Sequence, residues 1–308
     1  MTERFDLAVI GGGGAGYGAA TDAVGLGLSV LHVAGNQLPG GLMANVGELI
    51  DYPSGPQSLS GMALIESLAA VADQAGVRRE AVQLESIKAL PQGFSLQAAG
   101  RDWTVGQVIM ATGARLRALS VEGAQRFVDR GVLQCAWCNA GLFRGRTVVV
   151  VGGGDAALQE ALHLARYASR VVIVVRGDRL RARQSLVSRA ADQEHIEFRW
   201  DTELVSIEGG DALQAIRVRD RYASSDEHIE CDAVFPYLGL VSASELVADL
   251  VDLDDSGAVI TDSKGQTRTP GLFAIGALRS GYSGRLVSAL GEASTAAIAA
   301  ARRVDSNS

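Results

Sequence analysis

The sequence predicts an α/β fold, because short apolar runs alternate along the chain with glycine-rich turns and amphipathic segments. The order strand, glycine turn, helix, strand occurs twice, within residues 5–33 and again within residues 147–175. The chain has 308 residues, about twice the ~150 typical of one domain, which favours two domains. These observations predict two Rossmann-like, three-layer dinucleotide-binding domains, the second inserted into the first.

Apolar periodicity gives the order of the elements. The expected strands are residues 5–10, 29–33, 81–88, 94–98, 103–110, 148–151, 171–175 and 271–277, and the expected helices are residues 17–28, 64–75, 156–167 and 286–303. The chain is expected to cross between domains near residues 116–118 and 241–243, which bracket the second unit. The predicted domains are therefore residues 1–117 with 243–308, and residues 118–242.

Composition narrows the classes of function. The chain is 47% hydrophobic and 20% charged, which indicates a folded chain rather than a disordered one. Its formal charge of −7 opposes attraction to nucleic acid and to anionic lipid. No apolar stretch approaches the ~20 residues needed to cross a bilayer, and the N-terminal segment lacks the layout of a signal peptide. We therefore expect a cytoplasmic protein without a nucleic-acid or membrane partner.

The first glycine loop fits the pattern G-x-G-x-x-G with Gly11, Gly13 and Gly16, and it also contains Ala15. Gly11 permits a tight turn, Gly13 lets a pyrophosphate approach the backbone, and Gly16 allows the helix to pack closely on the strand. The alternative is a structural turn without a ligand. The position between a strand and a helix favours phosphate binding at the helix N-terminus.

The second loop has the form G-x-G-x-x-A and contains Gly152, Gly154, Asp155 and Ala156. Two such units suit an enzyme that passes electrons between two dinucleotides. The second strand of this unit is followed by arginines rather than by an acid, and we assign a 2′-phosphate contact to Arg176 and Arg181. This favours NADPH over NADH; the alternative is a solvated basic turn.

The three cysteines are too few for a disulfide framework, and no Cys/His cluster has zinc spacing, so no metal site is expected. Cys135 and Cys138 form a Cys-x-x-Cys pair, which indicates a reversible dithiol/disulfide centre, with two buried structural thiols as the alternative. Cys231 lies in an apolar run and is expected to be a core residue. Trp137, between the paired cysteines, is also expected in the core, with packing over the cysteine pair or over a flavin as the alternatives.

Several motifs recur along almost the whole chain in the order of one known family. They are residues 11–16, Gly40, Gly41, residues 48–53, Ala111, Thr112, Gly113, Cys135, Cys138, residues 152–154, Arg176, Arg181 and residues 271–276. In these motifs the chain resembles the low-molecular-weight thioredoxin reductases. The resemblance implies FAD in the first domain, NADPH in the second, domains that rotate relative to each other, and a homodimer.

The resemblance also implies individual roles. Cys138 would face the flavin, and Cys135 would attack a thioredoxin-like protein or a small disulfide or dithiol substrate. The further cofactor contacts that it implies are Gly40, Gly41, Asp51, Ala111, Thr112, Gly113, Gly276, Ala277, Arg285 and Leu286.

Some residues depart from the family pattern. Asn139 stands where the family has an Asp that donates a proton, and Leu142 follows where it has aromatic residues. Ala277 replaces an Asp expected on the FAD ribityl chain, a loss that predicts FAD binding about tenfold to a hundredfold weaker. Gly177 replaces a second Arg, and Asp51 replaces an Asn.

Three functions are compatible with these residues. The first is an NADPH-dependent flavoprotein that reduces an external disulfide through Cys135 and Cys138. The second is a flavin-dependent dithiol oxidase that passes electrons to O2, which the loss of Arg at Gly177 favours. The third is a redox- or nucleotide-sensing protein that has lost stable FAD, which Ala277 favours.

Overall fold

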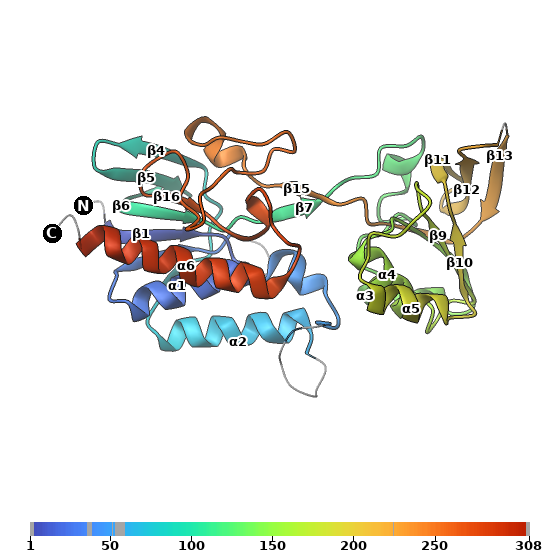
Figure 1. The fold of residues 1–308 in the computed structure, drawn as a ribbon, viewed down its shortest axis with the longest axis horizontal. Helices are drawn as coiled ribbons and strands as arrows, with labels where there is room; N and C mark the ends of the chain where they lie inside the picture. Colours follow the sequence, from blue (N-terminus) through green and yellow to red (C-terminus); the bar gives the residue numbers. More distant parts are fainter. Residues whose placement is uncertain (1–2, 36–38, 51, 53–58, 224, 306–308) are drawn as a thin grey trace. The chain divides into compact units, whose positions relative to one another are not determined.

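The structure is a computed structural model that describes residues 3–35, 39–50, 52, 59–223 and 225–305. The chain forms two compact units: Met1–Arg115 with Val241–Ser308, and Leu116–Leu240. Figure 1 shows a sheet with helices in each unit. Two short strands, β7 (Ala114–Leu116) and β15 (Leu240–Ser242), pair where the chain passes from one unit to the other and back.

The first unit is built on a seven-stranded sheet with the order β3-β2-β1-β6-β5-β4, and β16 also pairs with β6. The strands β1, β2, β3, β6 and β16 are parallel, while β4 and β5 join by antiparallel pairing. The start of β6 pairs with β5 and its end with β16. The strands are β1 (Glu3–Ile10), β2 (Val30–Val33), β3 (Arg78–Glu80), β4 (Ser86–Leu90), β5 (Gly93–Ala98), β6 (Arg101–Met110) and β16 (Leu272–Ala274).

Alternation along β1 produces the layers of this unit. Leu7 and Val9 pack with the helices α1 (Gly14–Gly25), α2 (Gly61–Gln74) and α6 (Leu286–Asp305). Ala8 and Ile10 point to the opposite face, where they join a second core with residues of β4, β5 and η4 (Glu245–Leu250). Figure 1 shows the three helices together on one side of the sheet.

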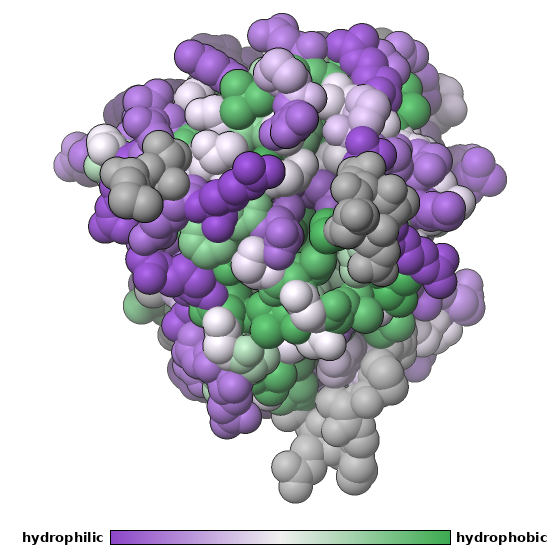
Figure 2. Space-filling view, turned by 90° about the vertical axis from the view of Figure 1, so that its left-hand side faces the viewer, coloured by the Kyte–Doolittle hydropathy of each residue, from purple (hydrophilic) through white to green (hydrophobic). Residues whose placement is uncertain are grey.

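The surface of the first unit is mixed in character. The face shown in Figure 2 carries mostly polar residues, with an area of apolar residues between them. Among the described residues, none of the helices combines the length and the apolarity that crossing a membrane requires.

The second unit contains a parallel sheet with the order β10-β9-β8-β14. Its helices α4 and α5 contact each other, and α4 packs on β8 and β9. A smaller antiparallel sheet, β11-β12-β13, shares a core with the parallel strands. The elements are α3 (Ala136–Asn139), β8 (Thr147–Val151), α4 (Asp155–Leu164), β9 (Arg170–Val174), α5 (Gln184–Ala191), β10 (Ile196–Arg199), β11 (Thr202–Gly209), β12 (Leu213–Asp220), β13 (Asp226–Glu230) and β14 (Ala233–Pro236).

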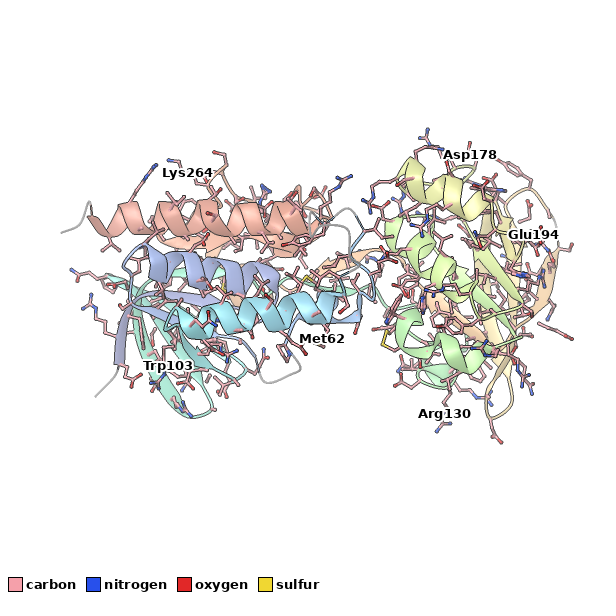
Figure 3. All side chains as sticks on the ribbon, turned by 90° about the horizontal axis from the view of Figure 1, so that it is seen from below. Met62, Trp103, Arg130, Asp178, Glu194 and Lys264 are labelled. Carbon is pink, nitrogen blue, oxygen red and sulfur yellow. A yellow bond between two sulfur atoms is a disulfide. The ribbon has the colours of Figure 1, made fainter. Side chains whose placement is uncertain are left out.

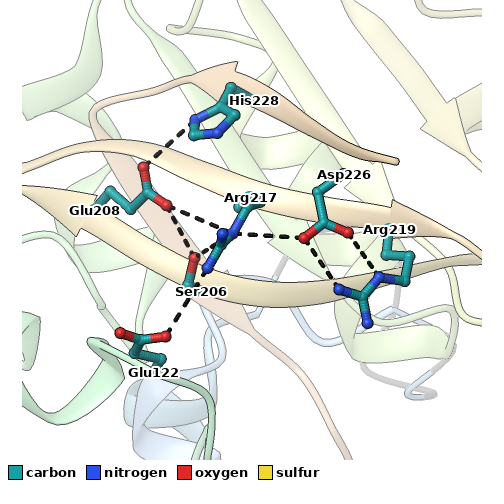
Figure 4. A network of polar contacts seen from close by, with 7 residues as sticks. All are labelled: Glu122, Ser206, Glu208, Arg217, Arg219, Asp226 and His228. Atoms are coloured by element: carbon teal, nitrogen blue, oxygen red, sulfur yellow. Dashed lines mark hydrogen bonds and ion pairs between the residues drawn. The ribbon is translucent and has the colours of Figure 1, made fainter. Parts of the chain in front are cut away.

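The small sheet has a polar outer face (Figure 4). Arg217 Nε donates to Ser206 Oγ at 3.1 Å and lies 3.6 Å from a carboxylate oxygen of Glu208. On the same face Arg219 makes two hydrogen bonds to Asp226, whose pKa is lowered chiefly by that contact. These ion pairs are mostly exposed, so we assign them little stability and no role in a site.

Short 3₁₀ turns complete the fold. They are η1 (Gly41–Asn45), η2 (Ala124–Phe127), η3 (Ala140–Phe143) and η5 (Gly276–Leu278). The expected strand at residues 81–88 is wrong in its first half, because β3 ends at Glu80 and β4 begins at Ser86. Val82 and Leu84 in the connection still pack onto the second core of the first unit, which explains their strand-like alternation.

Candidate cofactor sites and redox centre

The first glycine loop has a conformation that requires glycine. Gly11 has φ +127°, and a Cβ atom there would lie 2.2 Å from the carbonyl oxygen of Ala111. A Cβ on Gly16 would lie 1.9 Å from the carbonyl oxygen of Gly11, so this residue brings α1 against the turn. At Gly13 a Cβ would meet only Gly40 O, at 3.9 Å. The loop therefore combines a tight turn, an approachable backbone and close helix packing.

A buried histidine also holds this turn. His32 on β2 places Nε2 2.9 Å from the carbonyl oxygen of Gly11. Burial lowers the pKa of His32, so the ring is neutral at neutral pH and donates from Nε2. Sequence reasoning missed this residue, although a polar residue in the middle of the apolar strand 29–33 is the signal that could have found it.

A cavity of about 540 Å³ opens beside the loop. The predicted residues that line it are Gly11, Gly13, Ala15, Gly40, Gly41, Ala111, Thr112, Gly113, Gly276, Ala277 and Leu286. Gly16 and Arg285 are not among its lining residues, and Asp51 lies outside the described residues. Sequence reasoning missed Gln83, Leu246 and Tyr282, which also line it.

The chemistry of this cavity suits a dinucleotide. The helix α1 begins after Gly13 without a capping side chain and without an acid in its first turn, so its N–H groups are available to an anion. Aliphatic side chains line much of the rest, including Val33, Leu84 and Leu286, and they suit an aromatic ring system. The described residues therefore fit FAD.

One carboxylate lies near the position where Ala277 stands. The Gly276 N–H donates to Glu292 Oε2 at 2.7 Å, and Arg279 Nε lies 3.6 Å from the same oxygen. Glu292 is on α6, and it thereby orders the turn that carries Ala277 into the cavity. Sequence reasoning missed Glu292, and the signal that could have found it is a lone acid inside the Ala-rich segment 286–303.

The second glycine loop repeats the turn of the first. Gly152 has φ +142°, and a Cβ there would lie 2.4 Å from the carbonyl oxygen of Tyr237. Gly154 is in open space at the start of α4. The adjacent cavity, of about 1050 Å³, is lined by Gly152, Arg176 and Arg181 among others. It also contains Arg117, Arg179 and Arg221, which sequence reasoning did not single out.

Other predicted residues of this loop lie outside the cavity. Gly154, Asp155 and Ala156 are not among its lining residues. Asp155 instead accepts the Arg183 N–H at 2.7 Å and makes an ion pair with the guanidinium of the same residue. Asp178, at the surface after β9 in Figure 3, lines the cavity beside Arg176 and Arg179. The excess of arginine makes this a site for an anion such as a phosphate.

Cys135 and Cys138 form a disulfide in the second unit, and Figure 3 draws it as a yellow bond. Cys138 is exposed and Cys135 half-buried. The Cys138 N–H donates to Cys135 Sγ at 3.1 Å, and Asn139 Nδ2 donates to the carbonyl oxygen of Cys135 at 2.7 Å. Cys231 is free and buried, as expected, and burial raises the pKa of its thiol to about 12.

The expectation that Trp137 is a core residue is wrong. Its side chain is 41% exposed, and its ring stacks on His163 of α4 with centroids 3.9 Å apart. One turn earlier on the same face of α4 lies Glu160, whose carboxylate accepts a hydrogen bond from the backbone N–H of Trp137 at 3.2 Å. Burial raises the pKa of Glu160 to about 7. Neither neighbour was singled out from the sequence.

Comparison with known proteins agrees with this geometry. A family model described as pyridine nucleotide-disulphide oxidoreductase matches residues 5–300. The thioredoxin reductase of Treponema pallidum (strain Nichols) is 31% identical over 305 residues, covering 99% of each chain. The thioredoxin reductase of Listeria monocytogenes is 33% identical over 289 residues, 94% of this chain and 90% of that one.

The chain belongs to the pyridine nucleotide-disulphide oxidoreductase family. Among solved structures, Lactococcus lactis thioredoxin reductase has a TM-score of 0.94 at 31% identity and covers 98% of this chain and 99% of its own. The thioredoxin reductase of T. acidophilum has a TM-score of 0.92 at 29% identity, with 99% and 100% covered. The predicted family and fold class are confirmed.

Membership of this family also confirms the predicted class of enzyme. Thioredoxin reductases are flavoprotein disulfide oxidoreductases that use FAD and NADPH, and the disulfide between Cys135 and Cys138 agrees with that chemistry.

Proposed function

We propose that this protein passes electrons from NADPH through FAD to the Cys135–Cys138 disulfide and on to an external disulfide. The observation that carries the proposal is the disulfide-bonded pair in a chain with two glycine turns, each beside its own cavity. When bound, the flavin accepts a hydride from NADPH and supplies an electron pair to a disulfide. The protein's part is to bind, to orient and to control the thiols.

In the first unit, the proposal assigns FAD to residues 1–117 and 243–308. The backbone at Gly13 and the N-terminus of α1 hold the pyrophosphate, because a side chain at that point would fill the space that a phosphate needs. The turn at Gly276 and Ala277 lies on the wall of the same cavity, where Glu292 fixes its backbone. Ala277 supplies no carboxylate, so FAD affinity rests on the remaining contacts.

In the second unit, the proposal assigns NADPH to residues 118–242. Arg176 and Arg181 lie on the wall of the cavity, and the Arg181 N–H donates to Gly153 O at 2.8 Å. This bond ties the arginine turn to the glycine loop. The 2′-phosphate of NADPH then faces guanidinium groups, which bind phosphate through bidentate hydrogen bonds. Arg221 enters the same cavity and offsets the missing arginine at Gly177.

The two cysteines have different roles in the proposal. Cys135 attacks the external disulfide, and Cys138 receives electrons from the flavin. The Cys138 N–H bond to Cys135 Sγ supports this division, because a donor at the sulfur favours its thiolate form. In a Cys138→Ser variant, Cys135 should then form a stable mixed disulfide with the substrate, which mass spectrometry of the trapped complex would detect.

The electron acceptor is proposed to be a thioredoxin-like protein or a small disulfide. The relatives are named thioredoxin reductases, which supports the first choice. Close to the cysteines, Leu142 is 76% exposed and Trp137 is 41% exposed, and they offer an apolar contact surface to such a partner. We further propose that the protein acts in the cytoplasm as a homodimer, for which light scattering of the purified protein is the test.

A nucleotide-sensing protein without stable FAD is the second candidate, and Ala277 in the wall of the first cavity favours it. Colour discriminates the two: a protein that is purified without flavin and resists reconstitution supports the sensor. A dithiol oxidase is less favoured, because it has no use for the arginines of the second cavity.

The proposal is tested by following NADPH oxidation with thioredoxin or an aromatic disulfide as acceptor. The wild-type chain should turn over, whereas Cys135→Ser and Cys138→Ser should lose activity toward thioredoxin. Turnover of thioredoxin that persists without either cysteine would contradict the proposed path of the electrons.

A further inference from the structure

Two backbone amides between the paired cysteines have acceptors on other elements of the second unit. The Ala136 N–H points at Tyr237 Oη, 3.4 Å away, and the Trp137 N–H donates to Glu160 Oε2 at 3.2 Å. Tyr237 follows β14 and Glu160 is on α4. The two residues inside the Cys-x-x-Cys motif are therefore bound to one tyrosine and one carboxyl group.

Glu160 and Tyr237 also interact with each other. The Tyr237 hydroxyl hydrogen-bonds the Glu160 carboxylate, and the residue Glu160 is only 9% exposed. Burial raises the pKa of Glu160 to about 7, and the bonds from Trp137 N–H and the Tyr237 hydroxyl act in the opposite direction. Burial and the nearby Glu160 charge raise the pKa of Tyr237. Glu160 is thus a buried acid that changes charge near neutral pH.

The other ionisable groups around α4 are engaged or face solvent. On α4 itself, Asp155 pairs with Arg183 and His163 stacks on Trp137. On β9, Arg170 makes an ion pair with Glu197 at 2.7 Å. The remaining charged groups on elements packed against α4 are Arg189 of α5, which is exposed, and the cysteines beside α3. Besides Tyr237 and His163, the thiols of the reduced pair are the ionisable groups of the segment that Glu160 binds.

Reducing the pair needs protons as well as electrons. The S–S bond breaks, the two sulfurs take up one electron pair, and two protons convert them to thiols. The electron pair comes from the NADPH-reduced flavin of the proposed function, on which this inference rests, or from a chemical reductant in a test. Asn139 has no acidic proton to give, and its side-chain amide already donates to the Cys135 carbonyl oxygen at 2.7 Å.

We propose that Glu160, supported by Tyr237, is the positioning residue that controls protonation of the reduced Cys135–Cys138 pair through the Ala136 and Trp137 amides. In its neutral form it leaves thiolate formation unopposed. In its charged form it raises the pKa of the thiols, because its buried negative charge repels a thiolate formed on the segment that it binds. Position 139 has no ionisable group, and Glu160 on the next helix supplies one beside the Cys-x-x-Cys segment.

The test measures thiol reactivity against pH in the full-length flavoprotein, reduced with a phosphine and without NADPH. The rate of alkylation by iodoacetamide at Cys135 and Cys138 is followed by mass spectrometry from about pH 5 to pH 9. Wild type and Glu160→Gln should react alike near pH 6. Above pH 7 the variant should react several-fold faster, up to about tenfold for a coupling of one pKa unit.

Three further variants separate an electrostatic role from a structural one. Tyr237→Phe removes a bond to the charged carboxylate, which should raise the pKa of Glu160. In the Tyr237→Phe background, the pH above which Glu160→Gln increases the alkylation rate should therefore move up by about one unit. Glu160→Asp should keep an inflection near neutral pH. Glu194→Gln changes an exposed residue of the same unit, labelled in Figure 3, and should follow wild type throughout.

Cys231 reports folding in the same experiment, because a buried thiol reacts only when the unit opens. If Cys231 becomes reactive in Glu160→Gln, that variant has lost its fold, and the test then depends on Glu160→Asp and Tyr237→Phe. Superimposable profiles of wild type and Glu160→Gln, or one constant difference at every pH, would overturn the inference. Because NADPH is absent, this result is independent of whether NADPH reduces the flavin, so failure of the proposed function can be told apart.

Discussion

The two glycine loops share one backbone turn and differ in what surrounds it. Gly11 and Gly152 both have strongly positive φ, +127° and +142°, and each turns its chain against a carbonyl oxygen. Beyond the turn, glycine and aliphatic residues line most of the first cavity, whereas several arginines line the second. In the proposed function this turn holds phosphate in both units, and the residues after the second strand decide which nucleotide binds.

The loops differ again at their third position. Gly16 leaves no space for a side chain, while at the matching place Ala157 carries its Cβ 3.4 Å from where a Cβ of Gly152 would be. The helices also differ: Asp22 of α1 is exposed, whereas α4 buries Glu160 behind the cysteine pair. The first loop is therefore packed more tightly, and α4 rather than α1 buries a carboxylate.

The largest expected effect comes from breaking the tighter loop. In Gly16→Val the new Cβ would collide with the Gly11 carbonyl, so α1 must move away and FAD binding should fall by more than about a hundredfold. The purified variant should be colourless, while 2′,5′-ADP binding to the second unit, measured by calorimetry, should be retained. Retention of flavin by this variant would show that the first loop does not hold it.

The next largest effect concerns the buried acid of α4. A folded-state pKa of about 7, above the ordinary 4.5, stabilises the fold below pH 4.5, and this stabilisation is lost as pH rises through 7. From about pH 5 to pH 8, wild type should therefore lose about 2 to 3 kcal/mol relative to Glu160→Gln. Urea unfolding of both proteins at the two pH values measures the difference. An equal change in the free energy of unfolding of the two proteins would contradict a raised pKa at Glu160.

The arginines of the second cavity should give a tenfold to hundredfold effect. A charge-assisted bond contributes about 1.5 to 3 kcal/mol, so Arg176→Gln should raise the KM for NADPH by about that factor and leave the KM for NADH nearly unchanged. Arg189→Gln, on the exposed side of α5, is the control and should leave both constants unchanged. Equal losses for the two nucleotides would place the 2′-phosphate elsewhere.

The smallest expected effect tests the wall of the first cavity. Ala277→Asp returns a carboxylate to the position where the family pattern has one, and FAD should bind about tenfold more tightly. Flavin fluorescence during titration of the apoprotein reports the affinity. A weaker complex would mean that the nearby Glu292, held by Gly276 N–H and Arg279, repels a second carboxylate.

Local patterns in the sequence predicted the strands and helices of the two nucleotide units well. A strand of apolar residues that ends at Gly11 or Gly152 has one physical outcome, since only glycine adopts the turn that follows. The small antiparallel sheet was not predicted, because its strands carry many charged residues and their apolar faces become apparent only against the parallel sheet. The extended segment before Ser86 resembled a strand because its apolar residues cover a core.

The site was predictable where a motif carries the chemistry, as at Cys135 and Cys138. It was not predictable where chemistry arises from long-range packing. Glu160 and Tyr237 are separated by 77 positions and meet only because α4 and the end of β14 flank the same short helix. His32 and Glu292 likewise act on backbone groups of remote turns, which no spacing in the sequence reveals.

The central claim is that electrons from NADPH reach the cysteine pair through the flavin, and an anaerobic NADPH titration tests it most directly. Flavin and disulfide each take two electrons, so the flavin absorption band of wild type should bleach fully only after about two equivalents of NADPH per chain. The Cys138→Ser variant should need about one. A flavin band that stays unchanged under excess NADPH would contradict the account.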